Sequence, residues 1–217
     1  MTRAIAVLLA LGVGIAASDA RAETFEEKAT GAMKIAQLDE LVWVTTATCD
    51  RGDDVINRQC RRVRDSRLAE LEGKPLLVEA SPTLFTVSPW NSAKKSAQVT
   101  LSGCLACEGI AEGGKTWLVL ATAPRVDDGK LSAAPISDKA LPFASDEERT
   151  KFAMAVHAVR VELVVELAKK PRWQLAGKDG ISLDVLAYRV VSPCNGNVVL
   201  SAPASGSVPP NPKACTK

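Results

Sequence analysis

The stretch Val159–Leu167, VRVELVVEL, decides how the second half of this chain folds, because its pattern is compatible with a helix or with a strand. A single helix over residues 146–170 would have apolar side chains on two opposite faces. As a strand, the stretch largely alternates apolar and charged residues, and its valines favour extended backbone. Ser145 and Glu148 form a capping-box pattern, which marks a helix start at that point. We therefore predict a short helix over about 146–156, followed by a strand.

Short segments rich in Val, Leu and Thr lie on both sides of this stretch and also predict strands. They are the segments 76–80, 83–87, 97–101, 116–123, 181–191 and 197–202. The pair Asn195-Gly196 favours a tight hairpin turn between the last two. Residues 124–145 contain several prolines and an Asp-Asp-Gly run, so we expect a long surface connection there.

The residues before these strands predict helices. Residues 24–46 carry apolar groups close to a helical spacing, with acids early in the segment. A second helix from about Val55 to Leu71 follows a turn in which Asp53 can cap the helix start. The apolar side of that helix consists of Ile56, Cys60, Val63, Leu68 and Leu71.

The predicted fold class is α+β. Residues 23–74 form an N-terminal helical segment, and residues 75–202 form a mainly antiparallel β-rich domain with one further short helix. Residues 203–217 are rich in proline and are expected to form a tail without regular structure. Disulfide bonds are expected to stabilise this fold.

Residues 1–22 have the features of a secretory signal peptide. Arg3 precedes an apolar run, and Ala20-Arg21-Ala22 is a small-x-small cleavage signal before Glu23. The apolar run is too short for a comfortable membrane span, and no later segment approaches about 20 uninterrupted apolar residues. We expect a soluble protein of the periplasm or the extracellular space, with cleavage near Ala22/Glu23.

The chain is close to neutral, with 27 Lys and Arg against 25 Asp and Glu and a formal net charge of +2. With charges so nearly balanced, we expect no strong positive electrostatic potential that would attract nucleic acid or an anionic membrane. The densest basic cluster lies between Arg58 and Arg67, where acids such as Asp65 and Glu70 are near enough to neutralise it. We expect a solvated, salt-bridged helix face there, and the alternative is an anion-binding site.

All six cysteines follow the expected signal peptide, and an even number in an exported protein favours disulfides. The expected pairs are neighbours along the chain: Cys49 with Cys60, Cys104 with Cys107, and Cys194 with Cys215. The first bond would tie the junction of two antiparallel helices. The last would pin the proline-rich tail.

Cys104 and Cys107 have the C-x-x-C spacing of thiol-disulfide enzymes, in which a helix N-terminus lowers the pKa of the first thiol. Here the following glycines are poor helix formers, and Glu108 places a negative charge beside the thiol. Haem attachment needs a histidine in place of Glu108, and zinc needs further ligands, for which Cys194 and Cys215 are the candidates. We predict a structural disulfide near the tip of a hairpin, with a redox centre and a metal site as alternatives.

The remaining candidates for chemistry are a histidine and two tryptophans. His157, the single histidine, could serve a hydrolase, but the chain has no G-x-S-x-G motif, and a histidine in an apolar stretch is more often packed. Trp90 and Trp173 lie in expected loops, where an indole can contact a sugar or a protein. Closure over the edges of the sheet is the favoured interpretation of both.

The sequence therefore predicts an exported, non-enzymatic binding or envelope-interaction protein, with no cofactor and no metal. Its expected partner is a protein or glycan of the cell envelope. The alternative is a thiol-disulfide oxidoreductase that uses Cys104 and Cys107, and a hydrolase centred on His157 is a weaker alternative.

Overall fold

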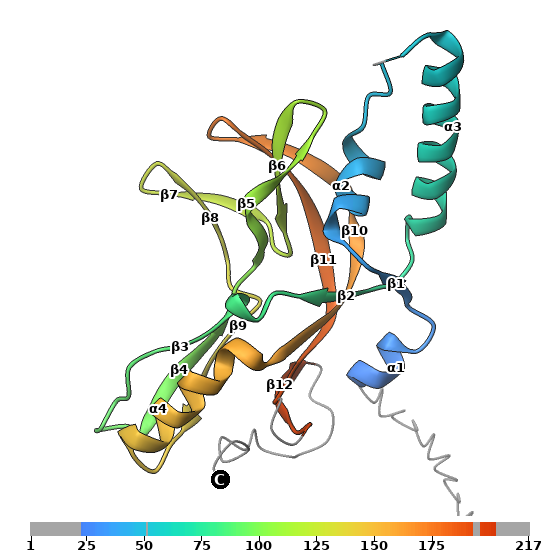
Figure 1. The fold of residues 1–217 in the computed structure, drawn as a ribbon. Coiled ribbons are helices and arrows are strands. Elements are labelled where there is room, and N and C mark those ends of the chain that lie inside the picture. Colours follow the sequence, from blue (N-terminus) through green and yellow to red (C-terminus); the bar gives the residue numbers. More distant parts are fainter. Residues whose placement is uncertain (1–22, 51, 193–195, 203–217) are drawn as a thin grey trace, which may run out of the picture.

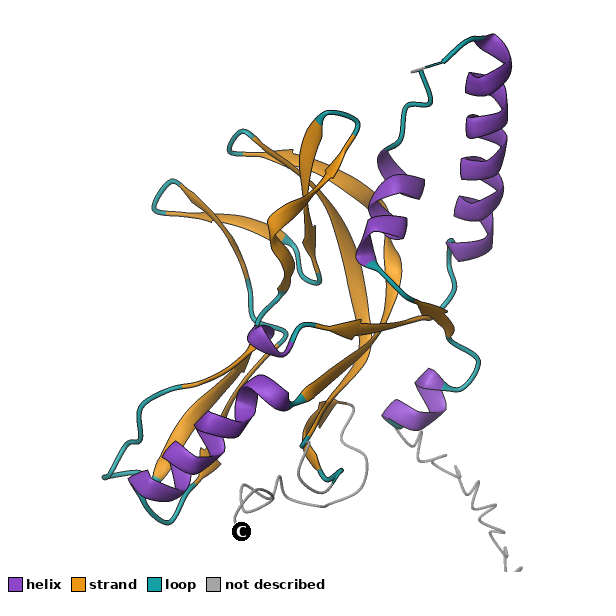
Figure 2. Ribbon diagram, in the orientation of Figure 1, coloured by secondary structure: helices purple, strands orange, loops and turns teal. Residues whose placement is uncertain are grey.

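The computed structural model describes residues 23–50, 52–192 and 196–202. The expected signal peptide, Cys194 and the proline-rich tail with Cys215 lie outside these residues. The described chain is α+β, with helices in the N-terminal part, a large mixed sheet, two smaller antiparallel sheets and one later helix (Figures 1 and 2). The predicted fold class is confirmed. None of the helices in the described ranges is long and apolar enough to cross a membrane.

The large sheet is built around a long antiparallel hairpin of two strands, β10 and β11. Its strands in spatial order are β1 (Met33–Ile35), β2 (Leu76–Ala80), β10 (Arg160–Leu175), β11 (Lys178–Val191), β6 (Lys115–Leu120) and β5 (Cys104–Glu112), with β12 (Val198–Ala202) also paired to β11. The pairs β1–β2 and β6–β11 are parallel, and the other pairs are antiparallel. Parallel pairing needs a long connection between the strands, and a helical segment supplies it between β1 and β2.

The stretch Val159–Leu167 lies at the centre of this sheet, where most of it forms β10 as predicted. Val161, Leu163 and Val165 have no exposed surface and pack into the main hydrophobic core. Val164 lies on the opposite face of the strand and is equally buried. Both faces of the strand are therefore covered, which explains why valine and leucine predominate in it.

A short helix, α1 (Phe25–Ala29), covers that opposite face of the sheet. Phe25 packs there against Val164. The Arg189 guanidinium lies 4.4 Å from the centre of the Phe25 ring and forms ion pairs with Glu162 and with an acid of α1. One arginine thus links the helix to both central strands through its charge and through its contact with the aromatic ring.

The prediction of a continuous helix over residues 24–46 is wrong. Gly31 has φ of +85°, a left-handed conformation that suits glycine and interrupts a helix. Met33–Ile35 then forms β1, and α2 (Leu38–Thr46) starts only after it. The backbone groups of β1 form sheet hydrogen bonds with β2, which replace those of a helix.

The predicted second helix is present as α3 (Asp54–Leu71). Asp53 caps it, because its carboxylate accepts hydrogen bonds from two N–H groups of the first turn. The expected Cys49–Cys60 disulfide joins the segment after α2 to this helix. Local signals were therefore sufficient to predict α3 and its attachment.

The expectation that residues 124–145 form only a surface connection is wrong. Asp128 and Gly129 both have positive φ and form the turn of a hairpin, as in a type I′ turn. Pro124 begins one strand and Pro142 ends another, positions where a missing N–H is tolerated. The strands of the two smaller sheets are β7 (Pro124–Asp127) and β8 (Lys130–Ala133) in one, and β3 (Phe85–Val87), β4 (Ser96–Leu101) and β9 (Ser137–Pro142) in the other.

The later helix, α4 (Asp146–Ala155), packs beside the β3–β4–β9 sheet through aromatic rings. The ring of Phe152 lies 6.4 Å from that of Phe85 and 5.5 Å from that of Phe143, measured between centroids. Ser145 caps the helix as predicted. The helix thus closes one end of the main core.

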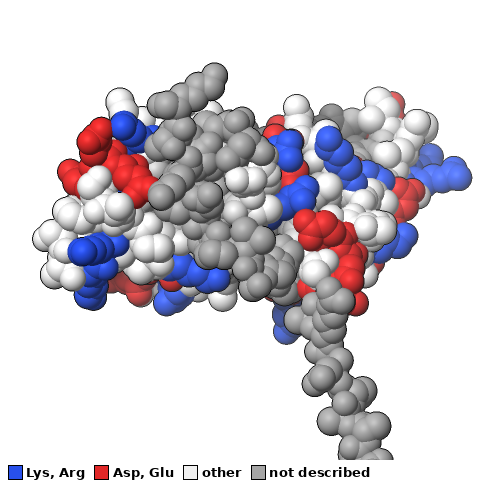
Figure 3. Space-filling model, turned by 90° about the horizontal axis from the view of Figure 1, so that it is seen from below, with Lys and Arg blue, Asp and Glu red and all other residues white. Residues whose placement is uncertain are grey.

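Charged side chains of both signs are interspersed over the face of the molecule seen in Figure 3. This arrangement agrees with the nearly equal counts of basic and acidic residues in the chain. It gives that face no extended field of one sign.

Candidate ligand pocket

Cys104 and Cys107 form the expected disulfide. They lie at the start of β5, where Cys104 is the partner of Leu120 at the end of β6. The turn between these strands is at Gly113 and Gly114, at the other end of the hairpin. The bond therefore lies at the open end of the hairpin, and not at its tip as the pattern led us to expect.

The disulfide fits because β5 is not a regular strand at this point. Three residues of regular strand span about 10 Å, whereas the Cα atoms of Cys104 and Cys107 are 5.5 Å apart. The pairing register with β6 shifts on both sides of Ala106, as in a bulge. Cys107 is exposed in this arrangement, and Cys104 is half-buried.

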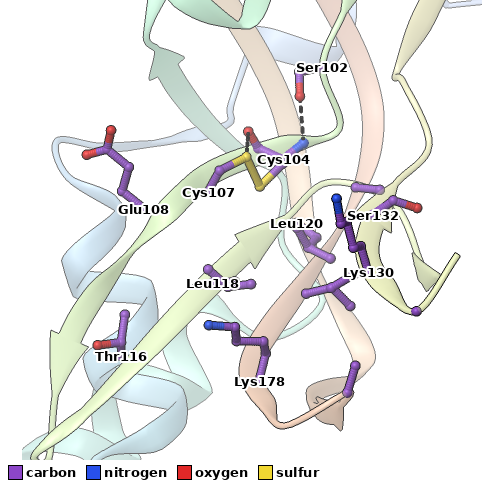
Figure 4. Close-up of a pocket in the computed structure, with 14 residues that line it drawn as sticks. Ser102, Cys104, Cys107, Glu108, Thr116, Leu118, Leu120, Lys130, Ser132 and Lys178 are labelled. Atoms are coloured by element: carbon purple, nitrogen blue, oxygen red, sulfur yellow. Dashed lines mark hydrogen bonds between the residues drawn. A yellow bond between two sulfur atoms is a disulfide. The ribbon is translucent and has the colours of Figure 1, made fainter. Parts of the chain in front are cut away.

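A pocket of about 600 Å³ lies beside the disulfide (Figure 4). One wall is the β5–β6 hairpin, another is the β7–β8 hairpin, and the turn between β10 and β11 contributes a third side. We call it the cystine pocket and define it by Cys104, Cys107, Leu118, Leu120, Lys130 and Lys178. Its size is within the range of small-molecule sites.

The cystine pocket combines apolar surface with positive charge. Leu118 is half-buried and Leu120 is buried, so the two leucines form an apolar floor. Lys130 and Lys178 are exposed, and neither has an ion-pair or side-chain hydrogen-bond partner among the described residues. Glu108 also lines the edge, but Figure 4 shows its carboxylate on the side of β5 that faces away from both lysines. Such a site suits an anion with an apolar body.

Trp90 and Trp173 do not line the cystine pocket. Both side chains are half-buried, and each indole Nε1 is buried without a hydrogen-bond partner among the described residues. Trp173 lies within β10 and not in the expected loop, and its ring covers Gly180 of β11, where it fills the space that a side chain would take. This placement agrees with closure over the edge of the sheet. A contact of Trp90 or Trp173 with a glycan or protein stays a prediction.

His157 lies in a 3-10 turn between α4 and β10. Its side chain is exposed and has no hydrogen-bond partner among the described residues. A hydrolase triad needs a histidine that contacts both a nucleophile and a carboxylate, so this part of the chain supplies no such arrangement.

The described residues also contain no group of three or more His, Cys, Asp or Glu side chains placed to hold a metal ion. Cys194 and Cys215, the other members of the metal site considered from the sequence, lie outside these residues.

Lys130 and Lys178 were not among the site residues predicted from the sequence. Each is the first residue of a strand that follows a tight turn, and the Gly129 and Gly177 that precede them are visible signals of those turns. Their meeting beside Cys104 depends on how separate hairpins pack, which turn signals do not show.

No family model, curated protein or solved structure matches this chain. Its function is therefore inferred from the geometry and the charge of the cystine pocket.

Proposed function

We propose that this protein is an exported, non-enzymatic binding protein of the periplasm or the extracellular space, and that the cystine pocket holds its ligand. The ligand class is an amphipathic anion of the cell envelope, a molecule that joins an apolar chain to a carboxylate or phosphate. The observation that carries the proposal is the position of Lys130 and Lys178 beside the leucine floor, where neither lysine has an ion-pair partner in the described part of the chain.

Two kinds of interaction would hold such a ligand. Each methylene group buried against Leu118 and Leu120 contributes about 0.8 kcal/mol. Hydrogen bonds from a lysine ammonium to an anionic head group are charge-assisted and stronger than neutral ones. The Cys104–Cys107 bond ties the bulged backbone of one wall, so less conformational freedom is lost on binding.

Replacing both pocket lysines, Lys130→Ala with Lys178→Ala, should weaken the binding of dodecanoate by about tenfold or more. The two charge-assisted contacts together should contribute at least the roughly 1.4 kcal/mol that a tenfold change represents. The wild-type protein should bind dodecanoate more tightly than dodecyltrimethylammonium, which has the same chain and the opposite charge. Isothermal titration calorimetry measures both affinities.

The matched control replaces two exposed lysines outside the pocket, Lys74→Ala with Lys139→Ala, and removes the same total charge. This variant should bind dodecanoate like the wild type. Equal affinity for the two detergents, or an equal loss in both double variants, would contradict a specific anion site.

A second candidate function is thiol-disulfide exchange, which the exposure of Cys107 in a pocket with two lysines favours. Nearby cations stabilise a thiolate and lower the pKa of a cysteine. In this reaction a client thiolate attacks one sulfur of the Cys104–Cys107 bond and forms a mixed disulfide. The second client thiol then releases the client, which is oxidised to a disulfide while Cys104 and Cys107 become thiols.

The binding proposal predicts that the wild-type protein does not accelerate oxidation of a dithiol peptide. Cys104→Ser with Cys107→Ser should then leave peptide oxidation unchanged and should lower the free energy of unfolding by about 2 kcal/mol for such a short loop. The control is Cys49→Ser with Cys60→Ser, which leaves the pocket disulfide in place. If peptide oxidation occurs in the wild type and in this control but is lost in the first variant, the protein is an oxidoreductase instead.

A further inference from the structure

The helix α3 presents apolar side chains that the rest of the described chain does not cover. Leu71 is its one fully buried residue, whereas Val55, Ile56 and Val63 are 63%, 59% and 53% exposed. The apolar side that the sequence predicts for this helix is therefore buried at Leu71 but exposed at Ile56 and Val63. Figure 1 shows α3 standing beside the body of the molecule as a separate column. Helices in globular proteins usually bury an apolar face, so this one has surface available for a partner.

Polar and covalent contacts hold α3 in place. The Cys49–Cys60 disulfide links its second turn to the segment after α2. Arg64 donates a hydrogen bond of 2.6 Å to the Ala47 carbonyl oxygen, and Arg67 forms an ion pair of 2.6 Å with Glu40 of α2. The helix is thus anchored along its length without much apolar burial.

A groove of about 820 Å³ runs along α3 and reaches Trp43 of α2. We call it the α2–α3 groove and define it by Trp43, Val55, Arg58, Arg62, Val63 and Ser66. Arg67 and Glu70 also line it, and they form an ion pair with each other. Val55 and Val63 lie about 12 Å apart along the helix, a spacing of eight residues. They provide two apolar contact points on one side of α3.

The groove also contains arginines without acidic partners. Arg58 donates its Nε–H to the Asp54 carbonyl oxygen, and it has no carboxylate partner among the described residues. Arg62, one turn further along, has no hydrogen-bond or ion-pair partner there at all. Arg67 differs, because hydrogen bonds to Glu70 and Glu40 raise the pKa of its guanidinium. Arg64 also forms an ion pair with Asp65, so among the described residues the predicted salt-bridged face occupies the C-terminal half of the helix.

We propose that the α2–α3 groove docks an acidic amphipathic helix of another protein. Such a helix would place apolar side chains on Val55 and Val63, and carboxylates one turn apart on Arg58 and Arg62. Bidentate contacts between arginine and carboxylate would define its register.

Two other occupants fit these observations less well. Gln59 and Ser66 interrupt the apolar strip of the groove, whereas a helix that lies in a membrane interface needs a wide apolar face. A second copy of the chain, docked through the same surface, would bring Arg58 and Arg62 close to their own counterparts. A separate acidic helix needs only a narrow apolar strip, and its carboxylates would pair with both arginines.

The test uses the full chain and an 18-residue capped peptide that forms a helix with leucines on one face and glutamates beside them. A peptide with lysine in place of every glutamate is the charge-reversed control. Fluorescence anisotropy of the labelled peptides should show binding of the acidic peptide, at least about tenfold tighter than of the basic one, and weaker at high salt.

Arg62→Glu and Arg61→Glu form a matched pair. The two residues are adjacent and exposed, neither has a partner within residues 23–50, 52–192 and 196–202, and of the two Arg62 alone lines the groove. Arg62→Glu should lower the affinity for the acidic peptide about tenfold, and Arg61→Glu less than about threefold. Val63→Ser should also weaken binding without any change in charge. Circular dichroism checks that each variant remains folded.

Several results would overturn this proposal. They are no binding of the acidic peptide, an equal affinity for the basic one, or an equal loss in Arg61→Glu and Arg62→Glu. Binding to vesicles of anionic phosphatidylglycerol in place of the peptide would assign the groove to a membrane. Dimers in sedimentation velocity that Arg62→Glu dissociates would assign it to a second copy.

Discussion

Leu163→Ala should lower the free energy of unfolding by about 2–5 kcal/mol. Leu163 has no exposed surface and lies in the first part of β10, where β2 pairs with one edge of the strand and β11 with the other. Its replacement removes buried apolar surface and leaves a cavity that a central strand cannot close by moving, because neighbours on both sides hold its backbone. Denaturation by urea, followed by circular dichroism on the oxidised protein, measures this change.

The control is Gln174→Ala in the exposed end of the same strand, where the change should be within about 0.5 kcal/mol. A loss below about 1 kcal/mol for Leu163→Ala would contradict the central position of β10. The difference between the changes in unfolding free energy of the two variants therefore measures the contribution of core packing. The Gln174→Ala variant accounts for the lower preference of alanine for a strand.

Gly103→Ala should lower the free energy of unfolding by about 1–3 kcal/mol and weaken dodecanoate binding as well. A Cβ atom at this position would lie 2.0 Å from the Ala134 carbonyl oxygen and 2.5 Å from Thr122 Oγ1. The Ala134 carbonyl is backbone, directly after β8, so relief of the clash has to displace the β7–β8 hairpin. That hairpin is one wall of the cystine pocket.

Thr122→Ala separates crowding from hydrogen bonding at this position. The Thr122 hydroxyl donates a hydrogen bond of 2.9 Å to the Ala134 carbonyl oxygen, and this variant removes it without adding an atom near Gly103. It should cost about 1 kcal/mol and leave dodecanoate affinity close to that of the wild type. If Thr122→Ala reproduces the full loss seen in Gly103→Ala, the close approach of Gly103 is not the cause.

Several elements could be predicted from the sequence because their signals are local. The alternation in Val159–Leu167 indicated a strand, and Asp53 and Ser145 indicated two helix starts, since each pattern acts over a few residues. The Cys49–Cys60 and Cys104–Cys107 pairs were expected because their spacing along the chain is short. In each case the residues that interact are also close in sequence.

The errors came where distant contacts compete with local preference. Residues 24–46 have a helical spacing of apolar groups, but pairing with β2 makes Met33–Ile35 a strand. In residues 124–145 the prolines suggested a loop, whereas the Asp128-Gly129 turn allows β7 and β8 to pair. A local sequence pattern does not show which strand a segment will pair with in the folded protein.

The candidate site illustrates the same division. The C-x-x-C pair and its chemistry were visible in the sequence. The pocket also needs Leu118, Lys130 and Lys178, and these residues come from three different hairpins. Their meeting results from the packing of those hairpins around the core, and packing depends on contacts between residues far apart in the chain. For this reason the sequence was sufficient for most strands of the large sheet, for two helix caps and for the Cys49–Cys60 and Cys104–Cys107 bonds, whereas the cystine pocket depends on tertiary packing.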